Sequence, residues 1–250
     1  MAEFKMKIAG YTANISSLFE STPQYFRSYL SDEAADFSAS VTREHIDFEQ
    51  ADLLEEAHRD GFRPRVFTDP FLERAAIQRA FAEFLFDRDI LLFHGSAIAV
   101  DQEGFLFTAH SGTGKSTHTR LWMQAFGDRA MMVNDDKPFL SLTSDGVLLH
   151  GSPWSGKHGL DRNVTVPLKG ICILERGADN RIFPISPEDA LPMLRKQAYA
   201  PMDERKLPKF LELTQQFSEA LPLWKMACNK NPEAAHMAYN TMHNKKEGLR

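Results

Sequence analysis

A glycine-rich segment between an apolar run and a helical pattern constrains this chain more than any other feature. Residues 109–117 read Ala-His-Ser-Gly-Thr-Gly-Lys-Ser-Thr, after a predicted strand over 104–108 and before a helix that continues through 119–123. Glycine lets backbone N–H groups turn towards phosphate oxygens, and the field at a helix N-terminus favours the same anions. The order strand, glycine turn, helix therefore predicts an α/β fold that holds a nucleotide by its phosphates.

The last residues of the turn define its chemistry. The segment fits the pattern G-x-x-x-x-G-K-[ST], except that Ala109 stands in place of the first glycine. Lys115 can reach the β- and γ-phosphates, and the Ser116 hydroxyl can ligate Mg²⁺. The alternative is a glycine turn that binds nothing, and the strand and helix on its two sides argue against it. The predicted nucleotide-binding residues are Ser111, Gly112, Thr113, Gly114, Lys115, Ser116 and Thr117.

Two adjacent acids follow a second apolar run. The apolar run 130–133 leads through Asn134 into Asp135 and Asp136. Phosphoryl transfer needs a divalent ion at the β- and γ-oxygens and a group that activates the acceptor. Carboxylates at the end of a strand suit both tasks, because Mg²⁺ prefers oxygen ligands; an exposed acidic loop without function is the alternative. We predict a metal site of Ser116, Asp135 and Asp136, with Asp135 as base or metal ligand.

A histidine, His94, ends the strand that precedes the strand of the glycine turn. His94 lies in the segment Phe-His-Gly-Ser-Ala, residues 93–97. If its strand neighbours the strand of the turn, the imidazole lies near the γ-phosphate, where it could ligate metal, orient a carboxylate or move a proton. The alternative is a histidine satisfied by backbone at a strand end. Together with the turn and the acid pair, the pattern predicts Asp135, His94 and Lys115 as catalytic residues.

The segment 151–158 has too many turn residues for a core strand, and ligand contacts concentrate in such loops. Lys157 and Arg162 are candidate cations for the triphosphate or for the charge that develops during transfer. Trp154 is a candidate for stacking on a base or for one wall of the acceptor site. The alternatives are exposed cations and a packed tryptophan.

Composition and charge limit the kinds of protein that this chain can be. The chain has 250 residues, 25% charged and 43% hydrophobic, which is typical of a globular protein. Its net charge of −5 argues against nucleic acid as the main partner. Cys172 and Cys228 lie far apart and indicate neither a disulfide framework nor a zinc site. The chain shows no signal-peptide core and no run of membrane-spanning length, so we expect a cytoplasmic protein without a membrane partner.

Patterns along the chain predict three parts. Residues 1–66 form a small α+β region, 67–243 the nucleotide-binding domain and 244–250 a flexible tail. Alternation and apolar runs predict strands over 6–11, 37–41, 90–93, 98–100, 105–107, 130–133, 139–142, 147–149, 168–174 and 223–227. Capping residues and helical spacing predict helices that begin at Asp69 and Ser186 and helices over 208–219 and 232–242.

These motifs resemble the HPr kinase and PEP-carboxykinase-like group of P-loop proteins. The similarity lies in residues 93–97, in the strand and turn that end at 111–117, and in Asn-Asp-Asp at 134–136. The resemblance implies a mixed β-sheet core with flanking helices and with a nucleotide across the strand ends. It also implies ATP and Mg²⁺ as cofactors.

The resemblance further implies roles for individual residues. Lys115 and Ser116 match the nucleotide and metal residues, Asp135 matches the acid that serves as base or metal ligand, and Asp136 lies beside it. His94 matches a histidine close to the transferred phosphoryl group. The implied activity is an ATP- and Mg²⁺-dependent phosphotransfer to a hydroxyl, with a serine of a peptide or small protein as the expected acceptor.

Two departures narrow this expectation. The chain is too short for the complete carboxykinase framework, which argues against oxaloacetate chemistry. The segment 174–177, Leu-Glu-Arg-Gly, ends an apolar strand and is not equated with the glycine-rich signature of HPr kinases, which argues against HPr as the acceptor. A kinase of a free serine-like compound and a non-catalytic nucleotide-dependent sensor or assembly factor are the alternative functions.

Overall fold

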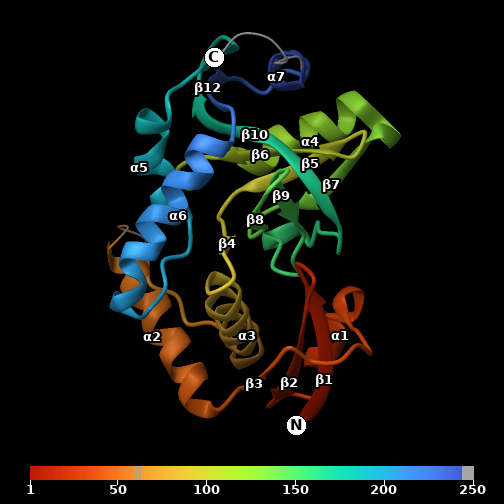
Figure 1. The fold of residues 1–250 in the computed structure, drawn as a ribbon, viewed down its shortest axis with the longest axis vertical. Coiled ribbons are helices and arrows are strands. Elements are labelled where there is room, and N and C mark those ends of the chain that lie inside the picture. Colours follow the sequence, from red (N-terminus) through yellow and green to blue (C-terminus); the bar gives the residue numbers. More distant parts are fainter. Residues whose placement is uncertain (60, 62, 244–250) are drawn as a thin grey trace. The chain divides into compact units, whose positions relative to one another are not determined.

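The computed structural model describes residues 1–59, 61 and 63–243. The chain forms two compact units, Met1–Leu85 and Phe86–Arg250 (Figure 1). The predicted domain boundary at residue 66 stays a prediction, and the predicted tail over 244–250 lies outside the described residues. None of the helices in the described chain combines the length and apolar character that crossing a bilayer requires.

The smaller unit contains a three-stranded sheet. β1 (Ala2–Ile8) and β2 (Tyr11–Ser17) are antiparallel, and β3 (Phe37–Ser40) pairs with β2 in parallel. Ala9 and Gly10 have φ of 51° and 87°, a backbone that turns the chain between β1 and β2. The strand predicted over 6–11 is therefore wrong: those residues end one strand and begin another.

The helix α3 (Asp69–Phe86) packs on this sheet. Phe37 of β3 stacks on Phe84 of α3 with ring centroids 3.9 Å apart. The buried Glu73 carboxylate accepts hydrogen bonds from a backbone N–H and a hydroxyl just after β2, which fixes the helix to the end of that strand. The other helical segments of the unit are α1 (Thr22–Tyr25), a 3-10 turn (Arg27–Tyr29) and α2 (Arg43–Arg59).

The larger unit is built on a mixed sheet with nine strands among the described residues. These are β4 (Ile90–Leu92), β5 (Ser96–Val100), β6 (Glu103–Thr108), β7 (Ala130–Asn134), β8 (Phe139–Thr143), β9 (Gly146–His150), β10 (Thr165–Arg176), β11 (Arg181–Pro184) and β12 (Leu223–Cys228). The strand order is β4-β8-β9-β10-β6-β5-β7, and β12 pairs with β10 and β11. The long β10 joins the parts of the sheet, because it pairs with β9 at its start, β6 in its middle and β12 at its end.

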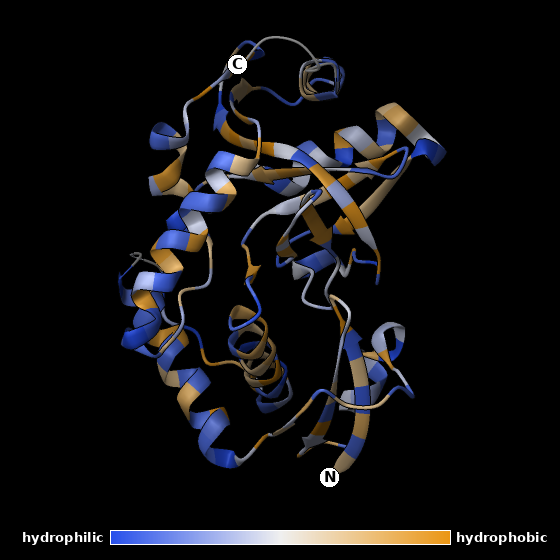
Figure 2. Cartoon of the chain, in the orientation of Figure 1, coloured by the Kyte–Doolittle hydropathy of each residue, from blue (hydrophilic) through white to orange (hydrophobic). Residues whose placement is uncertain are grey.

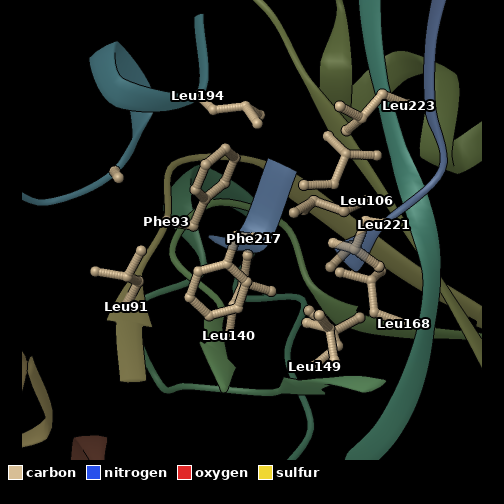
Figure 3. Packing of buried hydrophobic residues seen from close by; sticks show 14 of the residues in the cluster. Leu91, Phe93, Leu106, Leu140, Leu149, Leu168, Leu194, Phe217, Leu221 and Leu223 are labelled. Atoms are coloured by element: carbon tan, nitrogen blue, oxygen red, sulfur yellow. The ribbon is translucent and has the colours of Figure 1, made fainter. Parts of the chain in front are cut away.

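Helices cover both faces of this sheet. Neighbouring residues of a strand point to opposite faces, and in β6 both neighbours are buried and apolar. Leu106 belongs to one cluster, together with Leu194 and Phe217 (Figure 3). Phe107 belongs to a second cluster, together with Trp122. One face is therefore covered by α5 (Pro187–Gln197) and α6 (Leu207–Ala220), and the other by α4 (Lys115–Phe126) and α7 (Glu233–His243).

Hydropathy follows the same arrangement. Strands of the larger unit are largely hydrophobic in Figure 2, whereas α6 carries hydrophobic and hydrophilic residues side by side. The sheet is thus an internal layer and the helices have a solvent face. The predicted α/β fold with a mixed sheet and flanking helices is confirmed.

Two buried histidines should make the larger unit sensitive to acid. His118 is 2% and His150 5% exposed, and burial lowers the pKa of each imidazole from 6.5 to about 4. The unfolded chain takes up protons below pH 6.5, whereas the folded chain keeps both rings neutral until about pH 4. The free energy of unfolding should therefore fall as the pH drops from 6.5 towards 4, by about 1.4 kcal/mol per pH unit for each histidine.

Urea unfolding at several pH values between about 5 and 7 measures this dependence. His118→Gln and His150→Gln should each reduce the slope. Equal slopes in all of these proteins would show that the buried rings do not cause the acid sensitivity.

Candidate active site

The pairing of three strands brings three sequence motifs to one edge of the sheet. β5 is antiparallel to both β6 and β7, so the start of β5 lies at the same edge as the ends of β6 and β7. The glycine turn follows β6, His94 precedes β5, and Asp135 and Asp136 follow β7. The strand before His94, β4, pairs with β8 and not with β6, so the histidine reaches this edge through the β4–β5 connection.

The backbone of the glycine turn adopts conformations that favour glycine, and part of the turn is exposed to solvent. Gly112 and Gly114 have φ of 75° and 123°, values that strain any residue with a Cβ. The helix α4 begins at Lys115 with no side-chain cap and no acidic residue in its first turn. His110, Ser111 and Gly112 are exposed. The positive end of the helix dipole is therefore open to an anion from solvent.

The Lys115 side chain folds back into this turn. Its Nζ donates to the Ala109 carbonyl over 3.3 Å, and the residue is only 9% exposed. Burial lowers the pKa of Lys115; the charges of Asp136 and Asp135 oppose that shift, and Lys137 adds to it. The ammonium thus lies within electrostatic range of both acids. Ala109 itself, which replaces the first glycine of the pattern, is fully buried.

Asp135 is the buried member of the acid pair, at 5% exposed. Its Oδ1 accepts a hydrogen bond from Ser96 Oγ over 2.6 Å, and Ser96 Oγ lies 2.7 Å from Thr119 Oγ1. Its backbone N–H donates to the Leu160 carbonyl over 3.1 Å. Thr119 lies one helical turn after Lys115, so hydroxyl groups connect the acid to the helix of the glycine turn. Sequence patterns gave no role to Ser96 or Thr119.

Asp136 is the more exposed acid and pairs with His94. His94 Nε2 lies 3.2 Å from Asp136 Oδ1, with side chains 31% and 34% exposed. Burial lowers the pKa of His94 despite the hydrogen bond with Asp136. Burial also acts to raise the pKa of Asp136, but the hydrogen bond with His94 and the charge of Lys137 outweigh it and lower that pKa. At neutral pH the pair is therefore a neutral imidazole beside an ionised carboxylate.

Asn134 fixes the turn that carries the acids. The side chain is fully buried, and its Oδ1 accepts from the backbone N–H groups of Asp136 over 2.8 Å and Lys137 over 2.6 Å. Its Nδ2 donates to the Ser152 carbonyl over 2.7 Å. An amide is needed for this arrangement because it both accepts and donates. The sequence motif contained Asn134 but did not reveal this role.

The loop between β9 and β10 runs beside the acid pair. The Arg162 N–H donates to the Val133 carbonyl over 3.1 Å, which adds a short paired segment along β7. Gly156 has φ 69°, and a Cβ built on it would lie 3.4 Å from the Cβ of Asp136. This loop, with its 3-10 turn over Gly156–His158, therefore forms one side of the site.

The three predicted residues of this loop differ in accessibility. Trp154 is 7% exposed, so its ring is packed within the protein. Lys157 and Arg162 are exposed. Their exposure leaves the two cations available to a ligand, whereas stacking on a base would require an open face of the Trp154 ring. The ligand roles of all three stay predictions.

Two arginines that the sequence patterns did not single out contact the turn and its helix. Arg176, the last residue of β10, donates from Nη2 to the Gly112 carbonyl over 2.6 Å. Arg120 donates from Nε to the Ser116 carbonyl over 3.1 Å, and its Nη2 lies 2.9 Å from His158 Nε2. These contacts link β10 to the glycine turn and the β9–β10 loop to α4.

The donor set at this edge fits magnesium in a nucleotide complex. Within the described residues, no group of three His, Cys, Asp or Glu side chains is arranged to hold a metal ion unaided. Mg²⁺ in phosphotransfer sites takes one or two carboxylates and completes its shell with phosphate oxygens and water. Asp135, Asp136 and the Ser116 hydroxyl supply oxygen donors of that kind.

No protein-family description and no curated protein matches this chain. Among solved structures, one match is the Hpr(Ser) kinase/phosphatase from Coxiella burnetii, with 12% sequence identity and a TM-score of 0.33. That match covers 61% of this chain and 99% of the other. Similarity at this level carries no functional argument.

Proposed function

We propose that this protein is an ATP- and Mg²⁺-dependent phosphotransferase that moves the γ-phosphoryl group to a hydroxyl. The observation that carries the proposal is the meeting, at one sheet edge, of the glycine turn, the acid pair and His94. Each motif alone has a structural explanation, but their convergence combines a phosphate cradle, metal donors and a proton acceptor.

Each residue of the site would have its own role in binding or in transfer. Backbone N–H groups at the start of α4 and the Lys115 ammonium bind and neutralise the phosphates. Ser116 and the acid pair would hold Mg²⁺, which would supply positive charge to neutralise the phosphates. A bond forms between the acceptor oxygen and the γ-phosphorus as the bond to the β-phosphate oxygen breaks and ADP leaves. The acceptor proton passes to Asp135 or Asp136, and His94 orients the latter.

We propose a serine of a peptide or small protein as the acceptor. This part of the proposal rests on the resemblance of the motifs to HPr kinases. The exposed Lys157 and Arg162, both in the loop between β9 and β10, would supply contacts for an acceptor or for the triphosphate.

Incubation of the full chain with γ-labelled ATP, Mg²⁺ and candidate acceptors tests the proposal. The acceptors are the small proteins and peptides encoded beside its gene, free serine, and none. Label on a serine of a peptide, located by mass spectrometry, is the expected result. Label on free serine alone would identify a small-molecule kinase. Tight ATP binding without transfer to any acceptor would overturn the phosphotransferase proposal in favour of a nucleotide-dependent sensor.

A further inference from the structure

Three buried polar side chains form a continuous path from the acid pair to α4. Ser96 and Thr119 are fully buried and Asp135 is 5% exposed. The two links of the path are the 2.6 Å contact from Ser96 Oγ to Asp135 Oδ1 and the 2.7 Å contact between the two hydroxyl oxygens. Buried hydrogen bonds to an ionised group are stronger than neutral ones and set geometry more firmly.

The protons of this path have a defined direction. An ionised carboxylate only accepts hydrogen bonds, so the Ser96 hydroxyl donates to Asp135. The Ser96 oxygen can then accept, which assigns the Thr119 proton to the bond with Ser96. The alternative acceptors for Thr119, the carbonyls of Lys115 and Ser116, are both 3.4 Å away and fit less well. The path therefore runs from Thr119 through Ser96 to Asp135.

The path connects the two parts of the predicted metal site: Thr119 lies beside Ser116 on α4, and Asp135 is the predicted carboxylate ligand. Thr119 lies on the same helix as Ser116 and three residues after it, so its position follows that of the Ser116 hydroxyl. At the other end, only Oδ1 of Asp135 is occupied; among residues 1–59, 61 and 63–243 no group hydrogen-bonds its Oδ2. A carboxylate held by one oxygen presents the other in a fixed direction.

Resting on the proposed function, we infer that Ser96 and Thr119 are positioning residues that hold Asp135 for Mg²⁺ binding. They would orient the free carboxylate oxygen towards the same ion that the Ser116 hydroxyl ligates. Neither residue would touch the nucleotide. Loss of such a supporting hydrogen bond typically weakens metal affinity about 10- to 100-fold. A path that only ties β5 to α4 would change stability but leave metal affinity intact.

Mn²⁺ provides the probe, since it prefers the same oxygen ligands and is observed directly by electron paramagnetic resonance. The full chain is loaded with ATP and titrated with Mn²⁺, and metal-free ATP affinity is measured separately in the presence of a chelator. The variants are Ser96→Ala and Thr119→Val, with Thr119→Ser as the conservative variant that keeps the hydroxyl. Matched controls are Ser218→Ala and Thr214→Val, which remove buried hydroxyls that bond carbonyls in α6.

Ser96→Ala and Thr119→Val should weaken Mn²⁺ binding about tenfold or more while metal-free ATP affinity stays within twofold. Thr119→Ser and both controls should bind Mn²⁺ as the unaltered chain does. Mn²⁺ affinity that stays unchanged in folded Thr119→Val, with phosphoryl transfer intact, would overturn the inference and leave the proposed function standing. If the Ser96 and Thr119 variants bind Mn²⁺ more weakly but the unaltered chain itself transfers no phosphoryl group, the inference would be supported and the proposed function overturned. A chain that binds no ATP would overturn both.

Discussion

Replacement of Lys115 by alanine should abolish ATP-dependent phosphoryl transfer while the protein stays folded. The Lys115 ammonium would neutralise the β- and γ-phosphates as charge shifts between them. Loss of one preorganised electrostatic contact of this kind lowers kcat by about 10²- to 10³-fold. The cost to folding should be small, because burial already disfavours the charged side chain and lowers its pKa. In the folded protein the substitution removes the 3.3 Å hydrogen bond to Ala109.

The measurement combines initial rates of labelled transfer with urea unfolding of the same sample. Lys196→Ala, a substitution of an exposed lysine of α5, is the matched control and should change neither quantity. Lys115→Arg keeps a positive charge but not the point charge that fits the turn. It should bind ATP and remain severely impaired. Full activity in folded Lys115→Ala would contradict the role of the turn as a phosphate cradle.

Sequence patterns predict local features of the fold and of the candidate site, because the chemistry of neighbouring residues determines these features. Positive φ at Gly112 and Gly114 requires residues without a Cβ, so the glycines reveal the turn directly. The hairpin of β5 and β6 has positive φ at Asp101 and Gln102, a conformation that hairpin turns favour. The side chain of Ser186 accepts from the Asp189 N–H at the start of α5, as its position before Pro187 predicts.

Contacts between distant segments are less accessible to such reasoning. Ser96, Thr119 and Asp135 come from three different elements, and their hydroxyl path depends on the strand register that sets them opposite one another. Apolar runs show that strands exist but not which strands pair, so the pairing of β4 with β8 could not be read from them. Arg176 is a similar case, because its contact with Gly112 depends on how far β10 extends beside β6.

The two acids differ in burial and in hydrogen-bond partners, which a sequence does not show. Asp135 lies inside the hydroxyl path, whereas Asp136 pairs with the imidazole of His94 and is about one third exposed at its side chain. Adjacent residues of one turn thus meet different environments. The first is held firmly beside α4, and the second lies on the more accessible side where an acceptor could approach.

Replacement of Asp135 by asparagine should preserve ATP binding but lower turnover by about 10²- to 10⁴-fold. Asparagine has nearly the same shape, and its side-chain oxygen can still accept the hydrogen bond from Ser96. The fold and the orientation of the side chain should therefore persist. The negative charge is lost, however, and with it the proposed ligand for Mg²⁺ and the proposed acceptor for the hydroxyl proton. The rate should fall even at saturating ATP, because the loss concerns the transfer step.

Turnover numbers, together with the ATP dissociation constant in the presence of a chelator, distinguish this outcome from a general loss of structure. Asp145→Asn, in the exposed turn between β8 and β9, is the matched control. Asp136→Asn provides the comparison within the pair: a smaller loss of metal affinity than in Asp135→Asn, with an equal or larger fall in turnover, would assign the proton to Asp136 and the stronger metal contact to Asp135. Normal turnover in Asp135→Asn would show that the reaction does not need the negative charge of Asp135. The proposed role of this buried carboxylate would then be wrong.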